Sequence, residues 1–65
     1  MTSVFKVIDL WAVANLMKSD KMKYVELSLD EEDGSLSITA IKSPDDYEAI
    51  DYDPIEPVAN NLDSI

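Results

Sequence analysis

The residues with the clearest chemical potential in this sequence are carboxylates, and they gather in two segments. The first is the run Asp30–Gly34, which reads DEEDG, and the second extends from Asp45 to Glu56 and holds six acids. Clustered carboxylates serve two main kinds of chemistry, which are calcium coordination and general acid–base catalysis. Each kind also requires a particular spacing and particular surroundings.

The acidic run does not have the spacing of a calcium-binding loop. An EF-hand loop with Gly34 at its sixth position would begin at Leu29, which has no ligand atom in its side chain. Its twelfth position would be Ala40, where a bidentate glutamate is needed. We therefore expect no metal site, and we interpret the run as the solvated tip of a hairpin.

Catalysis is equally poorly supported by the residue types. General acid–base work needs a carboxylate with a shifted pKa in a cleft, and a chain of 65 residues has little room for one. The chain has no histidine and no cysteine, and all five of its basic residues are lysines. Nucleophilic triads and thiolate or imidazole zinc sites are thus ruled out. We therefore expect no catalytic residue and no cofactor, and we expect that the protein is not an enzyme.

The charge of the chain is large and unevenly distributed. The net charge is −9, with residues 1–25 contributing +2 and residues 26–65 contributing −11. Direct binding of nucleic acid requires clustered cations that displace counterions from phosphates, so we do not expect it here. An acidic surface favours a basic partner, or it simply keeps a small protein soluble.

Patterns for targeting and membrane insertion are weak. The longest uninterrupted apolar run is Leu10–Ala14, whereas a membrane-spanning helix needs about 20 residues. No basic region followed by an apolar run marks a signal peptide. We expect no membrane association and a cytoplasmic location, with which the lack of cysteine agrees. The size and composition are compatible with a bacterial or phage accessory protein.

The elements that must position these residues centre on a β-hairpin. Residues 22–29 and 35–42 alternate apolar and polar side chains on either side of the acidic run. A four-residue loop, 31–34, pairs Leu29 with Leu36 and Leu27 with Ile38 and keeps both pairs on one face. Gly34 then occupies the loop position that needs a positive φ.

The segment after the hairpin has two interpretations. A third strand over residues 47–52 would place Ile38 opposite Ile50, Leu36 opposite Tyr52 and Ile41 opposite Tyr47. The alternative is a short helix from Pro44 to Ile50, capped by Ser43. We favour the strand because it pairs more apolar residues and because three strands are more stable than two.

The N-terminal sequence predicts a helix from about Ile8 to Ser19. Two alternatives stay open for the residues before it: the helix extends back to Ser3, or residues 2–7 form a strand and the helix begins near Asp9. Its apolar residues surround it almost completely. We expect a face centred on Val4, Ile8 and Trp11 to pack on the sheet. The surplus apolar residues would then support self-association as a homodimer, and they are Leu10, Val13 and Met17.

The predicted fold class is therefore α+β, with one N-terminal helix packed on a small antiparallel sheet. Residues 1–53 are expected to form a single small domain, and residues 54–65 an irregular acidic tail in which Pro54 and Pro57 oppose regular structure.

Two hypotheses of function follow from these elements. The first is a small acidic protein-binding module, an inhibitor or mimic directed at a basic, nucleic-acid-binding protein. Its contact surface would combine apolar residues on the open face of the sheet with nearby acids, namely Tyr24, Glu26, Ile41, Asp45, Asp46, Tyr47, Glu48, Asp51, Asp53 and Glu56. In a competing interpretation the C-terminal tail covers this face. The second hypothesis is a self-associating accessory or structural protein.

Overall fold

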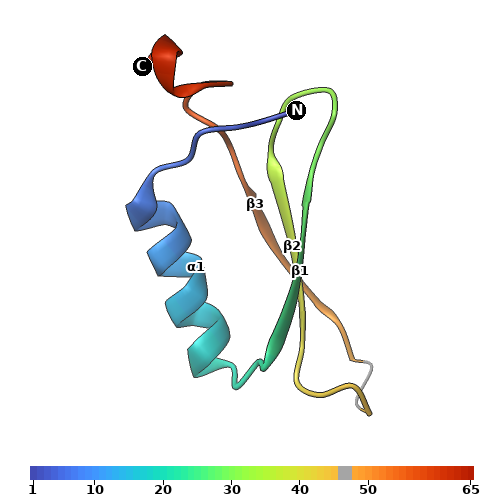
Figure 1. Cartoon of the computed structure of the whole chain (residues 1–65). Coiled ribbons are helices and arrows are strands. Elements are labelled where there is room, and N and C mark those ends of the chain that lie inside the picture. Colours follow the sequence, from blue (N-terminus) through green and yellow to red (C-terminus); the bar gives the residue numbers. More distant parts are fainter. Residues whose placement is uncertain (46–47) are drawn as a thin grey trace.

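The computed structural model describes residues 1–45 and 48–65. Its elements are helix α1 (Val7–Ser19), strands β1 (Tyr24–Leu29), β2 (Leu36–Ile41) and β3 (Ile50–Ile55), and a 3-10 turn at Leu62–Ser64. The strands form one antiparallel sheet in the order β1-β2-β3. Helix α1 lies along one face, and no other element that the structure describes lies over the opposite face (Figure 1). The expected α+β fold class is confirmed.

The hairpin register is the one that the alternating sequence predicts. Leu29 pairs with Leu36, and the same register continues along both strands to the pair of Tyr24 and Ile41. Apolar side chains of the two strands therefore share the face toward α1, because residues directly opposite in an antiparallel pair point to the same side.

The hairpin loop holds itself together with backbone and carboxylate hydrogen bonds. The Asp30 N–H donates to the Ser35 carbonyl at 2.9 Å, and the Gly34 N–H donates to the Asp30 carbonyl at 2.9 Å. The Asp33 carboxylate accepts from the Ser35 N–H at 2.8 Å. Gly34 has φ +74°, a conformation that glycine adopts without steric cost. The four-residue loop predicted from the sequence is thus confirmed.

The third strand exists, but its predicted position and register are wrong. Strand β3 begins at Ile50 instead of residue 47, and it places Ile38 opposite Tyr52 and Leu36 opposite Ile55. The alternative helix from Pro44 to Ile50 is also not formed at its C-terminal end, where Ile50 is already in the strand. The predicted partner of Ile41, Tyr47, lies outside the described residues.

A bulge explains the shifted register. Between the pairs of Ile38 with Tyr52 and Leu36 with Ile55, two β3 residues, Asp53 and Pro54, face one residue of β2. The extra residue brings Tyr52 and Ile55, three positions apart, onto the core face, where both are half-buried. Strict alternation cannot produce this spacing. A proline is tolerated at such a site because β3 is an edge strand.

The orientation of α1 differs from the predicted one. The half-buried residues of the helix are Asp9, Val13 and Met17, which follow one another at intervals of four. Trp11 and Ile8, which we expected on the sheet, are 61% and 60% exposed. A helix that is apolar nearly all round has no single preferred face, so contacts at its ends decide the rotation. One such contact is the Tyr52 hydroxyl, which donates to the Asp20 carboxylate at 2.7 Å.

The residues before α1 form an extended strap instead of an additional helical turn. The Val4 N–H donates to the Ala59 carbonyl, and the Val58 N–H donates to the Val4 carbonyl, both at 2.9 Å. The Ser3 hydroxyl donates to the Gly34 carbonyl at 2.7 Å. The strap therefore ties the hairpin loop to the C-terminal segment, and the helix extension to Ser3 is wrong.

The C-terminal segment is more ordered than the predicted tail. Its first two residues, Pro54 and Ile55, belong to β3, so the expected boundary at residue 54 falls inside a strand. The following residues join the strap at the end of the sheet near the hairpin loop (Figure 1). One interpretation of the sequence had these residues covering the open face of the sheet, and that interpretation is wrong.

Among residues 1–45 and 48–65, the buried apolar side chains all lie on the central strand β2. They are Leu36, Ile38 and Ala40, which are 8%, 2% and 0% exposed. The same face of β1 is much less covered, since Val25 and Leu27 are 44% and 54% exposed. The helix thus covers the middle of the sheet well and leaves part of β1 open.

Candidate protein-binding surface

The open face of the sheet carries an apolar pair at one end. Tyr24 and Ile41 are direct cross-strand partners, and Tyr24 is 57% exposed. They line a shallow depression of about 310 Å³ together with Glu26, Thr39 and Ala49, and with Val25 at the strand edge. We call Tyr24, Glu26, Thr39, Ile41 and Ala49 the outer patch. The structure therefore brings together Tyr24, Glu26 and Ile41, as the sequence predicted.

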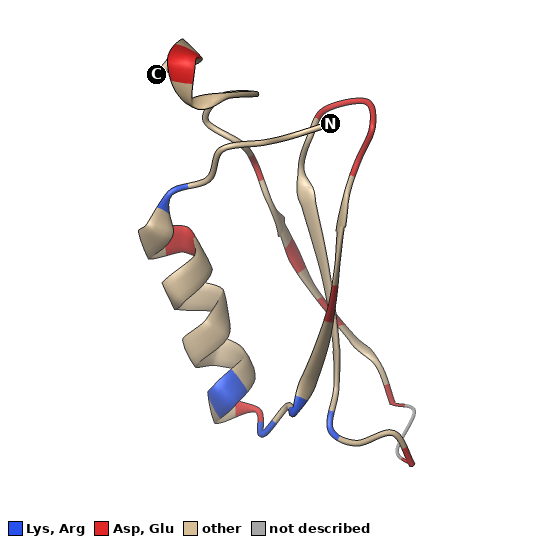
Figure 2. Cartoon of the chain, viewed as in Figure 1, with Lys and Arg blue, Asp and Glu red and all other residues tan. Residues whose placement is uncertain are grey.

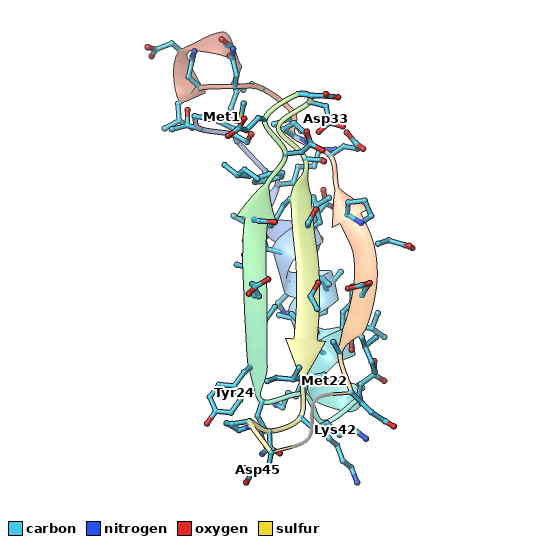
Figure 3. All side chains as sticks on the ribbon, turned by 90° about the vertical axis from the view of Figure 1, so that its right-hand side faces the viewer. Met1, Met22, Tyr24, Asp33, Lys42 and Asp45 are labelled. Carbon is cyan, nitrogen blue, oxygen red and sulfur yellow. The ribbon has the colours of Figure 1, made fainter. Side chains whose placement is uncertain are left out.

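One acid of the second carboxylate segment is fixed beside the outer patch. Asp51 lies opposite Thr39, and the Thr39 hydroxyl donates to the Asp51 carboxylate at 2.8 Å. This hydrogen bond holds a negative charge on the open face next to Ile41. Asp45 lies at the same end of the sheet as Tyr24 (Figure 3).

The other predicted acids are spread along β3 and its ends. Asp53 lies in the bulge and lines a groove between α1 and β3. Glu56 follows the strand, and both Glu48 and Glu56 are exposed. Asp46 and Tyr47 fall outside the described residues. The described acids are thus distributed along β3 and its ends instead of forming one compact cluster.

The three predicted self-association residues do not share one surface. Val13 is half-buried and lines the groove between α1 and β3. Met17 lines a different groove, between α1 and β1, and Leu10 lies beside the strap and the C-terminal turn. We expected Val13 and Met17 to point away from the sheet, and both instead belong to the half-buried side of the helix.

Four lysines from different segments lie close together in the structure, and this cluster was not predicted from the sequence. The end of the molecule where α1 leads into β1 carries four of the five lysines, and the acidic hairpin loop lies at the opposite end (Figure 2). These lysines are Lys18, Lys21, Lys23 and Lys42. The first three line the groove between α1 and β1, which has a volume of about 430 Å³. The signal that joins Lys42 to them is the hairpin register, which places it next to the start of β1.

Among the residues that the structure describes, Asp33 and Tyr52 have clearly shifted pKa values, and the two shifts have different main causes. Donation by the Ser35 N–H, and then by the Ser35 side chain, lowers the pKa of Asp33. Desolvation, followed by the contact with the Asp20 carboxylate, raises the pKa of Tyr52. Neither group lies in the outer patch. The shifts therefore reflect contacts that stabilise the fold, in the hairpin loop and between β3 and the end of α1.

Further features of the described residues bear on the site. No group of three or more acidic side chains among residues 1–45 and 48–65 is arranged to hold a metal ion. In the same part of the chain, no helix has the length and apolar character needed to span a membrane. The chain matches no protein-family model, no curated protein and no solved structure.

Proposed function

We propose that this protein is a non-catalytic protein-binding module that takes a basic protein onto the open face of its sheet. The observation that supports this proposal is the outer patch, in which exposed Tyr24 lies beside half-buried Ile41 with carboxylates on the border. Protein interfaces combine an apolar centre with a polar border in the same way. The cysteine-free chain suits the reducing cytoplasm, where we place this activity.

The two parts of the surface would contribute differently to binding. Tyr24 supplies apolar area and a hydroxyl at low conformational cost, which is why tyrosine often dominates interface energetics. Asp51 and the acids along β3 create a negative potential that speeds the approach of a cationic partner. A protein whose own ligand is a nucleic acid would present such cations, so the module would act on it as an inhibitor or mimic.

The proposal is tested by capturing partners from the source cells with the unaltered chain and two variants. The unaltered protein should retain a specific partner at low salt and less of it at high salt, because screening weakens electrostatic attraction. Tyr24→Ser should abolish retention. Ile8→Ser is the matched control, since Ile8 is 60% exposed on the helix and Tyr24 is 57% exposed on the sheet.

Two outcomes would contradict the proposal. The first is retention of the same partner by Tyr24→Ser, and the second is loss of the partner in the Ile8→Ser control alone. With a purified partner, Asp51→Asn should slow association at low salt and leave the dissociation rate nearly unchanged.

A further inference from the structure

The two edge strands of the sheet differ in how they are protected against pairing. β3 carries Pro54, a bulge and the acids Asp51 and Asp53, and each of these features discourages a further strand. β1 has no proline, its register with β2 is unbroken, and Glu26 is its only charged residue. The outer edge of β1 pairs with no other strand in the described sheet.

The inner face of β1 is also incompletely covered. Val25 and Leu27 point toward the side of α1, yet they are 44% and 54% exposed. Beside them runs the groove between α1 and β1, which is lined by Ala14, Met17 and Val25. The described part of the chain has three buried apolar residues and so a small core, and chains of this size commonly gain stability by association.

We propose that two copies of this chain associate through antiparallel pairing of their β1 strands, with Leu27 of one copy opposite Leu27 of the other. The result is a closed twofold dimer with one continuous sheet made from the two three-stranded sheets. This interface uses the edge of β1 and is independent of the function proposed for the outer patch.

Hydrogen-bond geometry allows this arrangement. The Asp30 N–H donates to the carbonyl of Ser35, the residue directly opposite it. Every second residue of β1 before Asp30 therefore also directs its N–H and carbonyl groups toward β2, and these residues are Ser28, Glu26 and Tyr24. The intervening residues of β1 direct their N–H and carbonyl groups toward the free edge of the sheet. These residues are Val25, Leu27 and Leu29. When Leu27 faces its own copy, Val25 faces Leu29, and all three residues meet partners with outward-directed groups.

Side-chain pairing selects the register. Centring the pair on Leu27 places only apolar residues opposite one another on the inner face, and it places Glu26 opposite Ser28 on the outer face. Centring it on Glu26 would put two carboxylates directly opposite each other, which destabilises a sheet. Any register shifted by a single residue would mix the apolar and polar faces.

Charge complementarity favours a second copy over an unrelated strand. Extended past the ends of β1, this register brings Lys23 of one copy beside Glu31 in the acidic hairpin loop of the other. Figure 2 shows four of the five lysines at the end of the sheet opposite the acidic loop, so an antiparallel pair brings opposite charges together twice. A parallel pair would instead place lysines beside lysines and acids beside acids.

The first experiment is sedimentation equilibrium on the full chain. The unaltered protein should have twice the 7.3 kDa mass of one chain. Leu27→Lys should raise the dimer dissociation constant about tenfold or more, because it places two cations in the apolar centre of the pair. Ile8→Lys is the matched control, at 60% exposure against 54% for Leu27, and should remain dimeric.

A monomer at high concentration of the unaltered protein would overturn the proposal. So would a dimer that Ile8→Lys dissociates and Leu27→Lys does not. Circular dichroism of each variant distinguishes dissociation from unfolding. If Leu27→Lys unfolds, a second pair of variants tests the same interface. Lys23→Glu alone should weaken the dimer, and the double variant Lys23→Glu with Glu31→Lys should restore dimer formation. Failure of that restoration would contradict the proposed pairing.

Cysteine cross-linking tests the register itself, because the natural chain has no cysteine. Leu27→Cys should form an intermolecular disulfide under mild oxidation, since directly opposite residues lie within bridging distance. Glu26→Cys should not, because Glu26 and its copy would be diagonal neighbours about 7–8 Å apart. Efficient cross-linking of Glu26→Cys with none of Leu27→Cys would overturn the register, and cross-linking of neither would overturn the interface.

Discussion

Strands β1 and β3 flank the same central strand, but they are secured in different ways. β3 is fastened to the helix through the Tyr52 hydroxyl and the Asp20 carboxylate, and its outer edge carries Pro54 and a bulge. β1 is fastened through the hairpin loop, and its outer edge is regular and nearly uncharged. One edge of this sheet therefore carries features that discourage pairing with a further strand, and the other edge carries none of them.

The largest expected loss of stability comes from a substitution in β2, the central strand that pairs with both β1 and β3. Ile38 is 2% exposed and pairs with Leu27 on one side and Tyr52 on the other. Ile38→Ala should reduce the free energy of unfolding by about 2–5 kcal/mol, because it removes buried methylene groups and leaves a cavity. Urea denaturation at fixed protein concentration measures this loss. Leu62→Ala, at 76% exposure, should change stability by less than about 0.5 kcal/mol.

The next effect is specific to the β1 side. Gly34→Ala should cost about 1–2 kcal/mol because its φ of +74° lies in the left-handed region. A Cβ atom at this position would also come within 2.7 Å of the Ser3 Oγ, so the Ser3 side chain or the strap must shift. Thermal denaturation of Gly34→Ala, Ser3→Ala and the double variant separates the two causes.

If backbone strain is the main cause, the double variant should recover little stability. Stability equal to that of the natural protein in Gly34→Ala would contradict the account of the loop.

A smaller effect is expected on the β3 side and depends on pH. The pKa of Tyr52 is raised above its ordinary value of 10.0, so the folded state favours the neutral phenol. This contribution is complete below that value and is lost as the pH rises through it toward the folded pKa. Tyr52→Phe should therefore lower stability at neutral pH and make less difference in alkaline solution. Urea denaturation of both proteins across this pH range measures the difference.

The smallest effect concerns the acidic loop. The pKa of Asp33 is lowered by the hydrogen bonds from Ser35, so its charged form stabilises the fold. This contribution is present above the ordinary value of 3.8 and is lost as the pH falls through the folded pKa. Asp33→Asn should lower stability near pH 6, and its difference from the natural protein should shrink toward pH 2. Chemical denaturation across that range measures the difference, and a constant difference would contradict the role given to the carboxylate.

The parts of the fold that were predictable depend on short-range patterns. The pairing of Leu29 with Leu36 follows from alternation on both sides of a loop that contains the only glycine. The register of β3 was not predictable in this way, because the bulge at Pro54 breaks the two-residue period. The rotation of α1 was not predictable either, since Trp11 and Val13 are both apolar and only contacts distant in sequence distinguish them.

The candidate surfaces show the same division. The pair of Tyr24 and Ile41 was predictable, because it depends only on the hairpin register. The position of Asp51 beside Thr39 depends on the shifted β3 register and was missed. The exposed face of Leu27 was missed as well, because alternation predicts which way a side chain points but does not predict how fully a helix covers it.

The central claim, that the edge of β1 is open and pairs with a second copy while the edge of β3 does not, can be tested most directly by amide hydrogen exchange. The edge-directed amides of β1 belong to Val25, Leu27 and Leu29, and those of β3 belong to Asp51 and Asp53. At high protein concentration the β1 amides should be protected, and dilution below the dimer dissociation constant should remove that protection. The β3 amides should exchange rapidly at every concentration. Rapid exchange of the β1 amides at all concentrations, or concentration-dependent protection of the β3 amides instead, would contradict the claim.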